Sequence, residues 1–157
     1  MSTCLHIDSV HEYPVEQIPP LLLAHIGDAV YELLARQVVL RQGIQRINRI
    51  HLATVELVNA VFQAQMAENI VSLLSEAERE IFRRGRNTKS TPPRHTDVAL
   101  YRQSTGLEAL FGYLYLNRRE ERIQELFGNG TFDMAERAVR FHLYLRSQTD
   151  DGGCGTI

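Results

Sequence analysis

Apolar residues recur along this chain at helical spacing, and no segment alternates apolar and polar residues as a half-buried strand does. Residues 21–41 are rich in leucine, valine and alanine and are too numerous for a strand, so they predict a helix. Pro20 suits the first turn of this helix, and Gly43 suits its end. Its charged side chains before Arg41 fall on one stripe at a spacing of four residues: Asp28, Glu32 and Arg36, with His25 beside them.

The same spacing predicts further helices. Residues 47–73 carry apolar side chains at helical intervals. Ser75 and Glu78 form a capping-box pattern that opens a third helix, and Gly85 is expected to close it. Residues 86–96 contain no apolar side chain larger than proline and therefore predict a loop.

Two helices are expected after this loop. Thr96 or Asp97 can cap a helix over residues 98–116, with a weak point at 104–106. A last helix is expected over residues 131–146.

Length and composition fit one folded domain. The chain has 157 residues, of which 44% are hydrophobic and 23% charged, and these ordinary values argue against wholesale disorder. We expect an irregular lead-in at residues 1–17, one all-α domain of five to seven helices at 18–147, and a disordered tail at 148–157. No apolar run is long enough to span a membrane, and no secretory signal is visible. Two cysteines, Cys4 and Cys154, provide neither a disulfide framework nor a zinc site, so a reduced, cytoplasmic protein is expected.

Positive charge is concentrated in one short segment. The formal net charge is −2, yet residues 81–104 carry six basic side chains and one acidic side chain. Such cationic, amide and hydroxyl groups are the usual contacts to phosphate and sugar. Residues 83–95, which hold five of the six basic side chains, contain no aromatic residue, so the backbone of a duplex fits better than a stacked single strand. The alternatives are a solvated loop or one that docks an acidic partner. The candidate phosphate contacts are Arg84, Arg86, Asn87, Lys89 and Arg94.

Two carboxylates lie in otherwise apolar helices. Glu108 is the only acid of residues 98–118, so it needs water, a cation or a base beside it. Asp28 follows Gly27, and a glycine inside a helix costs about 1 kcal/mol relative to alanine unless something must approach its backbone closely. Simpler explanations stay open, because Asp28 could belong to a solvated stripe and Glu108 could be exposed or paired with Arg102.

Carboxylates from different helices can together hold Mg²⁺. This ion takes oxygen ligands, often one or two carboxylates completed by water and substrate phosphate. Such a site can orient a water molecule against a phosphodiester, with the basic segment as the phosphate binder. Other classes lack their motifs, since the chain has neither a glycine-rich phosphate loop nor a nucleophile elbow.

Three segments match one family in their order and spacing. The first reads Ala-His-Ile-Gly-Asp-Ala-Val-Tyr-Glu at residues 24–32, and the second reads Arg-Gly-Arg-Asn-Thr-Lys at 84–89. The third begins with Thr-Asp-Val at 96–98 and reaches Glu-Ala-Leu-Phe-Gly-Tyr-Leu at 108–114. Over residues 18–147 the chain thus resembles Mini-III ribonuclease, a compact bacterial relative of ribonuclease III without its separate RNA-binding domain.

The resemblance implies an all-α homodimer that cleaves double-stranded RNA with Mg²⁺ and leaves 5′-phosphates. The implied task is maturation of the ends of large-subunit (23S) ribosomal RNA precursor, for which a ribosomal protein is a candidate helper. Asp28 matches the catalytic aspartate, Glu108 matches the metal-binding glutamate, and residues 84–89 match the loop that contacts RNA. Asp97 matches a recurrent acid of the family, which a helix cap explains equally well.

The chain departs from the larger ribonuclease III enzymes at Ala24 and Thr105, where those enzymes have acids. Mini-III ribonucleases share this smaller set. Water, or Thr105 beside the direct ligands, would complete the coordination. An alternative function is a non-catalytic dimer of this fold that binds structured RNA or a ribosomal partner. A third is an all-α nucleotide hydrolase, against which the single acid of the Glu108 helix argues.

Overall fold

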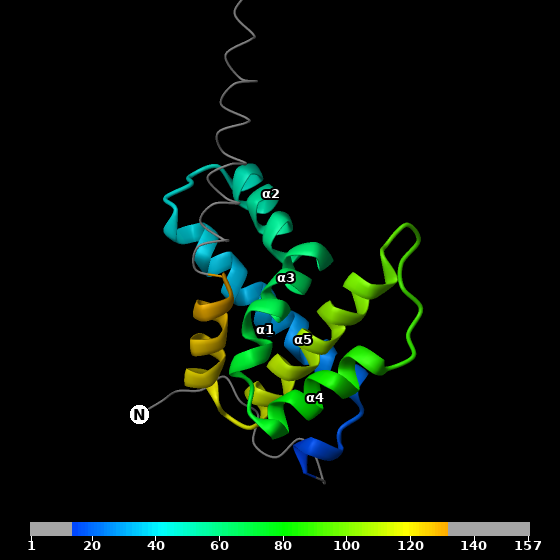
Figure 1. The fold of residues 1–157 in the computed structure, drawn as a ribbon. Helices are drawn as coiled ribbons and strands as arrows, with labels where there is room; N and C mark the ends of the chain where they lie inside the picture. Colours follow the sequence, from blue (N-terminus) through cyan, green and yellow to red (C-terminus); the bar gives the residue numbers. More distant parts are fainter. Residues whose placement is uncertain (1–13, 132–157) are drawn as a thin grey trace, which may run out of the picture.

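The computed structural model describes residues 14–131, and within this range it contains helices and no strand (Figure 1). The predicted all-α class is therefore confirmed. Its labelled helices are α1 (Pro20–Arg41), α2 (Ile47–Val58), α3 (Ala60–Ile70), α4 (Glu76–Asn87) and α5 (Val98–Leu116). Helix α5 lies in the middle, and α1, α3 and α4 pack against it. Short 3₁₀ turns are η1 (Val15–Gln17) and η2 (Val71–Leu73), and residues 120–131 are helical.

Helix α1 has the predicted boundaries. Pro20 is its first residue, where the missing N–H of proline has no partner to lose. Gly43 follows the C-cap with a φ of +72°, a left-handed conformation that glycine adopts without strain.

The prediction of one continuous helical segment at residues 47–73 is wrong in one respect, because the helix is interrupted at Asn59. This residue is extended, with φ −74° and ψ 156°, and its side-chain oxygen accepts a hydrogen bond of 2.9 Å from the Phe62 N–H. Asn59 thus ends α2 and caps α3. The break lets α2 pack mainly on the C-terminal half of α1 while α3 reaches the centre of the domain.

Helix α4 begins as predicted and ends later than predicted. Ser75 accepts from the Glu78 N–H, and the Glu78 carboxylate accepts from the Ser75 N–H, so the capping box is confirmed. Gly85 does not close the helix, which continues to Asn87. A Cβ atom at Gly85 would lie 2.7 Å from the Ala109 Cβ, so this glycine serves the contact between α4 and α5.

Helix α5 is capped by Asp97, whose carboxylate accepts hydrogen bonds of 2.7 and 3.2 Å from the N–H groups of Ala99 and Leu100. The predicted weak point at residues 104–106 is absent, and the helix is continuous there. Gly106 is instead a contact point, because a Cβ atom on it would lie 2.9 Å from the Phe82 carbonyl oxygen.

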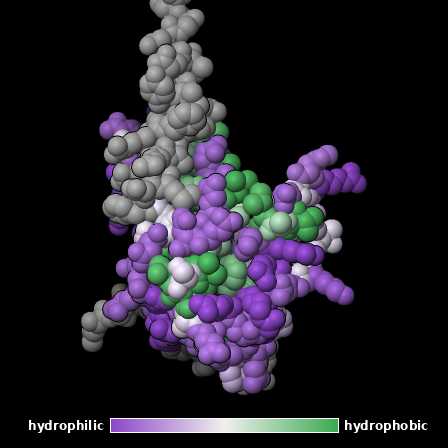
Figure 2. All heavy atoms as spheres, in the orientation of Figure 1, coloured by the Kyte–Doolittle hydropathy of each residue, from purple (hydrophilic) through white to green (hydrophobic). Residues whose placement is uncertain are grey.

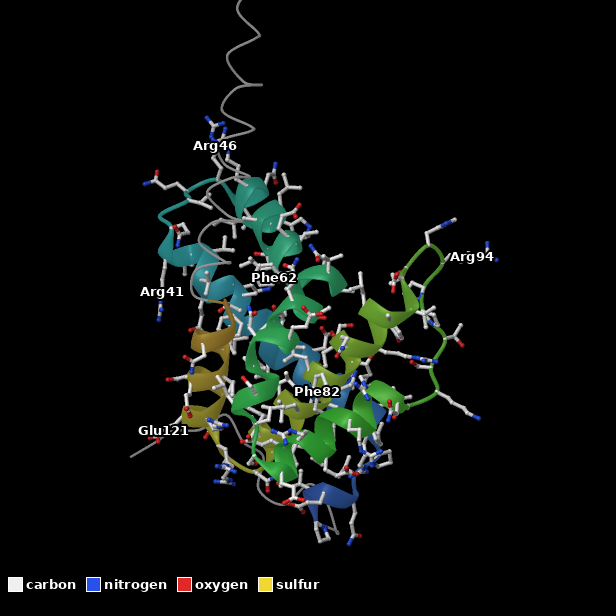
Figure 3. The ribbon with its side chains drawn as sticks, viewed as in Figure 1. Arg41, Arg46, Phe62, Phe82, Arg94 and Glu121 are labelled. Carbon is white, nitrogen blue, oxygen red and sulfur yellow. The ribbon has the colours of Figure 1, made fainter. Side chains whose placement is uncertain are left out.

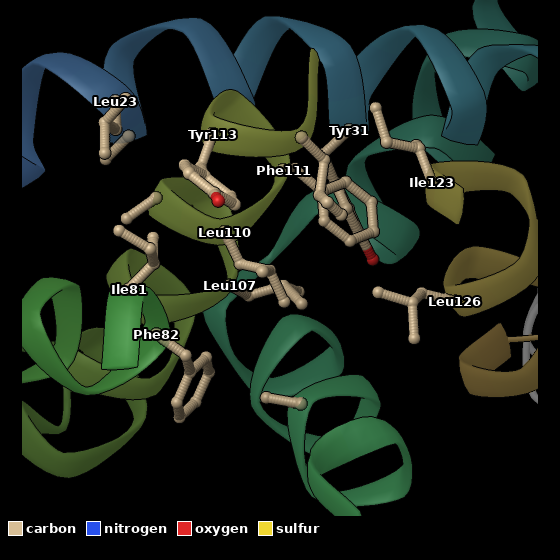
Figure 4. Close-up of a cluster of buried hydrophobic side chains, with 14 of the residues drawn as sticks. Leu23, Tyr31, Ile81, Phe82, Leu107, Leu110, Phe111, Tyr113, Ile123 and Leu126 are labelled. Carbon is tan, nitrogen blue, oxygen red and sulfur yellow. The ribbon is translucent and has the colours of Figure 1, made fainter. Parts of the chain in front are cut away.

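The core surrounds α5, which is buried on nearly every side from Ser104 to Leu114 (Figure 4). Three aromatic rings of Tyr31, Phe111 and Phe127 meet with centroids 5.6–6.5 Å apart. A helix that is apolar all round gains stability by burial within a domain. Glu108 is the one carboxylate of this central helix.

An internal ion pair attaches the helical residues 120–131 to α4. Arg122 donates to both carboxylate oxygens of the nearly inaccessible Glu78, at 3.0 and 2.9 Å, and to the Leu73 carbonyl at 2.7 Å. The sequence patterns did not predict this helical stretch. The helix predicted at 131–146 and the tail at 148–157 fall almost wholly outside the described residues, and the predicted irregular lead-in at 1–17 contains η1.

Candidate active site

Helices α1 and α5 approach so closely at Gly27 that no side chain fits between them. A Cβ atom at Gly27 would lie 1.7 Å from the Glu108 carbonyl oxygen. One at Gly112, a turn further along α5, would lie 1.9 Å from the carbonyl oxygen of Leu23, a turn back on α1. The helices therefore touch backbone to backbone. This contact explains the glycine inside α1, because only a residue without a Cβ atom fits there. This contact brings Asp28, the next residue, beside Glu108.

Glu108 is a partly buried carboxylate in a largely apolar setting. Burial raises the pKa of Glu108 to about 7, the Asp28 charge contributes to the rise, and the Gln63 amide lowers the pKa. Within residues 14–131 no ion pair joins Glu108 to Arg102, which is exposed. The pairing considered from the sequence is therefore not formed, and the neighbouring carboxylate is Asp28.

Asp28 lies at the surface edge of the same site. Partial burial raises the pKa of Asp28, and the nearby negative charge of Glu32 raises it further. The charge of His25 acts in the opposite direction. Glu32 forms the predicted pair with Arg36, whose Nε lies 3.0 Å from Oε1. The stripe thus exists, but its ion pair excludes Asp28.

A divalent cation fits this pair of carboxylates. The Asp28 charge makes ionisation of Glu108 more costly, and a cation bound between the two carboxylates would offset that cost. Within residues 14–131 no cluster of three or more histidine, cysteine, aspartate or glutamate side chains forms a metal site, so other ligands would be water and phosphate. Ala24 is buried, and the Thr105 hydroxyl donates to the Tyr101 carbonyl at 3.0 Å.

The raised pKa of Glu108 gives a stability prediction for the metal-free protein. Because the folded-state pKa is above the usual 4.5, ionisation penalises folding increasingly as pH rises from about 4.5 to about 7. We expect Glu108→Gln to remove a penalty on the order of 3 kcal/mol. In EDTA, its Tm should exceed the wild-type Tm by several degrees at pH 8 and match it near pH 4.5.

Glu68→Gln is the matched control, because Glu68 is an exposed acid of α3. Its Tm relative to wild type should differ little between the two pH values. If Glu108→Gln and wild type had the same Tm at pH 8, ionised Glu108 would not destabilise the metal-free protein, and the prediction would be contradicted.

The basic segment lies at the end of α4 and in the loop that projects between α4 and α5 (Figure 3). The predicted loop at 86–96 begins two residues later, since Arg86 and Asn87 are helical. Lys89 and Arg94 are exposed, and Arg94 points outward from the loop. Arg86 donates a 3.4 Å hydrogen bond to the Asn87 side chain. These four predicted contacts thus lie at the end of α4 and in the loop that follows it.

Arg84 differs from the other predicted contacts. Its guanidinium donates to the backbone carbonyls of Glu16 at 2.6 Å and Ile18 at 3.4 Å. Arg84 therefore anchors the segment around η1, and only the remainder of its guanidinium faces solvent. Arg83, in contrast, is neutralised by Glu80 through two contacts of 2.8 Å.

Sequence reasoning did not identify Gln63, which is 2% exposed on α3 and interacts with Glu108. Its Nε2 has no hydrogen-bond partner within the described part of the chain, because its approach to Glu108 falls short of hydrogen-bond geometry. A single glutamine in an apolar helix gives no signal of its own, so only the packing of α3 on α5 reveals it.

Comparison with known proteins bears on what this arrangement does. Residues 21–119 match the family model of the Ribonuclease III domain. A Mini-ribonuclease 3 from Thermoanaerobacter is 48% identical over 113 residues, which are 71% of this chain and 80% of that protein. One from Symbiobacterium thermophilum is 41% identical over 121 residues, 76% of this chain and 92% of that protein. The chain belongs to the Mini-ribonuclease 3 family.

A solved structure agrees with the Mini-ribonuclease 3 assignment. The crystal structure of a protein from Fusobacterium nucleatum superposes with a TM-score of 0.67 at 33% identity, covering 71% of this chain and 92% of that one. The family resemblance found in three sequence segments is thereby confirmed. No helix within residues 14–131 is long and apolar enough to cross a bilayer.

Proposed function

We propose that the chain cleaves double-stranded RNA with Mg²⁺ held by Asp28 and Glu108. Membership of the Mini-ribonuclease 3 family makes it an endoribonuclease of the ribonuclease III type. The observation that carries the metal proposal is the contact at Gly27, which brings together two carboxylates from different helices. Within residues 14–131 neither carboxylate takes part in an ion pair. When bound there, Mg²⁺ would activate water for attack on a phosphodiester, and 5′-phosphate products are expected.

Each residue of the site has a distinct part in this proposal. Glu108, fixed on the central helix, supplies a carboxylate in a setting that strengthens its attraction to a cation. Asp28, which is exposed, would supply a carboxylate that solvent and substrate can reach. The backbone contact at Gly27 keeps the two aligned, because neither helix can shift without losing the packing of α5.

The projecting basic loop would contact the RNA backbone. Arg86 at the end of α4 and the exposed Lys89 and Arg94 of the loop offer cationic groups, and Asn87 adds an exposed amide. A-form RNA presents phosphates and 2′-hydroxyls across a shallow minor groove, so recognition by shape is expected.

A homodimer is part of the proposal. Apolar side chains gather on one face of the molecule, over the junction of α2 and α3 and the start of α5 (Figure 2). Val55, Val61 and Val98 are 45%, 51% and 46% exposed. Such a shared face is typical of a surface covered by a second copy. Sedimentation equilibrium should then give twice the chain mass.

The natural substrate we infer is large-subunit (23S) ribosomal RNA precursor, with a ribosomal protein as helper, in the cytoplasm. The relatives' name, Mini-ribonuclease 3, and the match of residues 21–119 to the Ribonuclease III domain support a structured RNA as the substrate.

The deciding experiment is cleavage of long double-stranded RNA by the purified protein, with Mg²⁺ or with EDTA. Shortening that requires Mg²⁺ would support the proposal. An intact long duplex together with accurate trimming of precursor ribosomal RNA would indicate a selective enzyme. Binding without cleavage of either RNA would favour the non-catalytic alternative.

Neutralising the projecting loop should weaken RNA binding and reduce its salt dependence. In Arg86→Gln/Lys89→Gln, each lost phosphate contact should lower the slope of log K against log salt by about one. Arg83→Gln is the matched control, because Glu80 already neutralises this arginine. Filter binding of a short duplex across a salt series measures the slope. An unchanged slope in the double variant would remove the loop from the RNA interface.

A further inference from the structure

Gln63 carries an unpaired donor in the interior of the domain. The residue is 2% exposed, and its Nε2 is the one buried side-chain polar atom within residues 14–131 that has no hydrogen-bond partner. A buried donor without an acceptor costs folding free energy, so a protein keeps such groups where they serve another purpose.

Other buried polar groups of the domain are already paired. The Tyr31 hydroxyl donates to the Leu57 carbonyl at 2.9 Å, and the Thr105 hydroxyl donates to the Tyr101 carbonyl at 3.0 Å. The Gln63 amide instead faces the carboxylate of Glu108, with which it interacts short of hydrogen-bond geometry. The acceptor within its reach is therefore a group of the site itself.

We propose that Gln63 is a positioning residue, whose side-chain N–H donates to the Glu108 carboxylate and holds it in place when a divalent cation is bound. This inference rests on the proposed function. A hydrogen bond to an ionised acceptor in the interior is strong, because little water competes for it. The carboxylates that bind metals are generally held by such outer hydrogen bonds. Helix α3 is well placed for this role because it packs directly on α5.

The proposal is tested with two variants that remove the donor and keep the volume, Gln63→Leu and Gln63→Met. We expect the metal-free Tm to equal or exceed that of wild type, because each variant deletes an unpaired polar group. We expect Mn²⁺ binding, measured by electron paramagnetic resonance, to weaken by about 10-fold or more, and the Mg²⁺ concentration needed for RNA cleavage to rise in parallel.

Gln65→Leu is the matched control. It makes the same chemical change on the same helix at an exposed position, so it should leave Mn²⁺ binding unchanged. Unchanged Mn²⁺ binding in both Gln63 variants would overturn the proposal. So would a large loss of Tm, or failure to fold, in both, because Gln63 would then serve the fold.

Wild-type behaviour separates this proposal from the proposed function. If wild type binds Mn²⁺ but cuts no RNA, the proposed function is contradicted, while weaker Mn²⁺ binding in the variants still supports the role of Gln63. If wild type cuts RNA with Mg²⁺ and both variants match it in binding and cleavage, Gln63 loses its role and the function stands. A wild type that binds no Mn²⁺ overturns both.

Discussion

Replacing Asp28 with asparagine is expected to slow cleavage of double-stranded RNA by more than about 100-fold while the fold survives. Changes to the residues that merely support metal ligands cost 10–100-fold, so loss of a direct ligand should cost more. Asparagine has the same shape, and Asp28 is exposed, so packing should not change. Initial cleavage rates at saturating Mg²⁺, with Tm and circular dichroism on the same samples, measure both effects.

Asp97→Asn is the matched control for this experiment. Asparagine caps helices as well as aspartate does, so the hydrogen bonds to the N–H groups of Ala99 and Leu100 should persist. Cleavage should then continue near the wild-type rate. Loss of cleavage in Asp97→Asn would give this acid a role beyond capping, and retained cleavage in Asp28→Asn would remove Asp28 from the mechanism.

Gly27→Ala is expected to lower the free energy of unfolding by about 3 kcal/mol or more. The added Cβ atom would lie 1.7 Å from a backbone carbonyl oxygen of α5, and a backbone atom cannot turn away as a flexible side chain can. Helices α1 and α5 would separate, which also opens the core and disperses the two carboxylates. Urea unfolding, monitored by circular dichroism, measures the decrease in the free energy of unfolding.

Gly128→Ala provides a control of opposite sign. Gly128 lies in the helical residues 120–131, and a Cβ atom there meets nothing within 4 Å. Alanine is the better helix former, so this change should stabilise the protein by up to about 1 kcal/mol. A Gly27→Ala protein as stable as wild type would mean that α1 and α5 are not in backbone contact.

Local sequence signals predicted several helix ends because they act within a few residues. Ser75 with Glu78, Asp97 and Gly43 each satisfy or terminate backbone hydrogen bonds in their own turn, whatever lies elsewhere. The break at Asn59 had the same kind of signal, an asparagine cap, but an unbroken apolar pattern obscured it. The helical residues 120–131 were not predicted because their first turn is polar and shows too little apolar pattern to indicate a helix.

The sequence alone determined the fold class, the family and the two candidate carboxylates. Helical spacing of apolar residues gave the fold class, and three segments that resemble Mini-III ribonuclease gave the family. The carboxylates were found because Glu108 is alone in an apolar helix and Asp28 follows a glycine within a helix.

Only the tertiary structure decided what lies against what. In the structure Gly85 contacts α5 and does not end α4, and Arg84 donates to the backbone near η1. The Gln63 amide faces Glu108 and has no hydrogen-bond partner within the described residues. These features depend on groups from distant parts of the chain that packing brings together, and a glycine, an arginine or a glutamine looks the same in sequence whether or not such a neighbour is present.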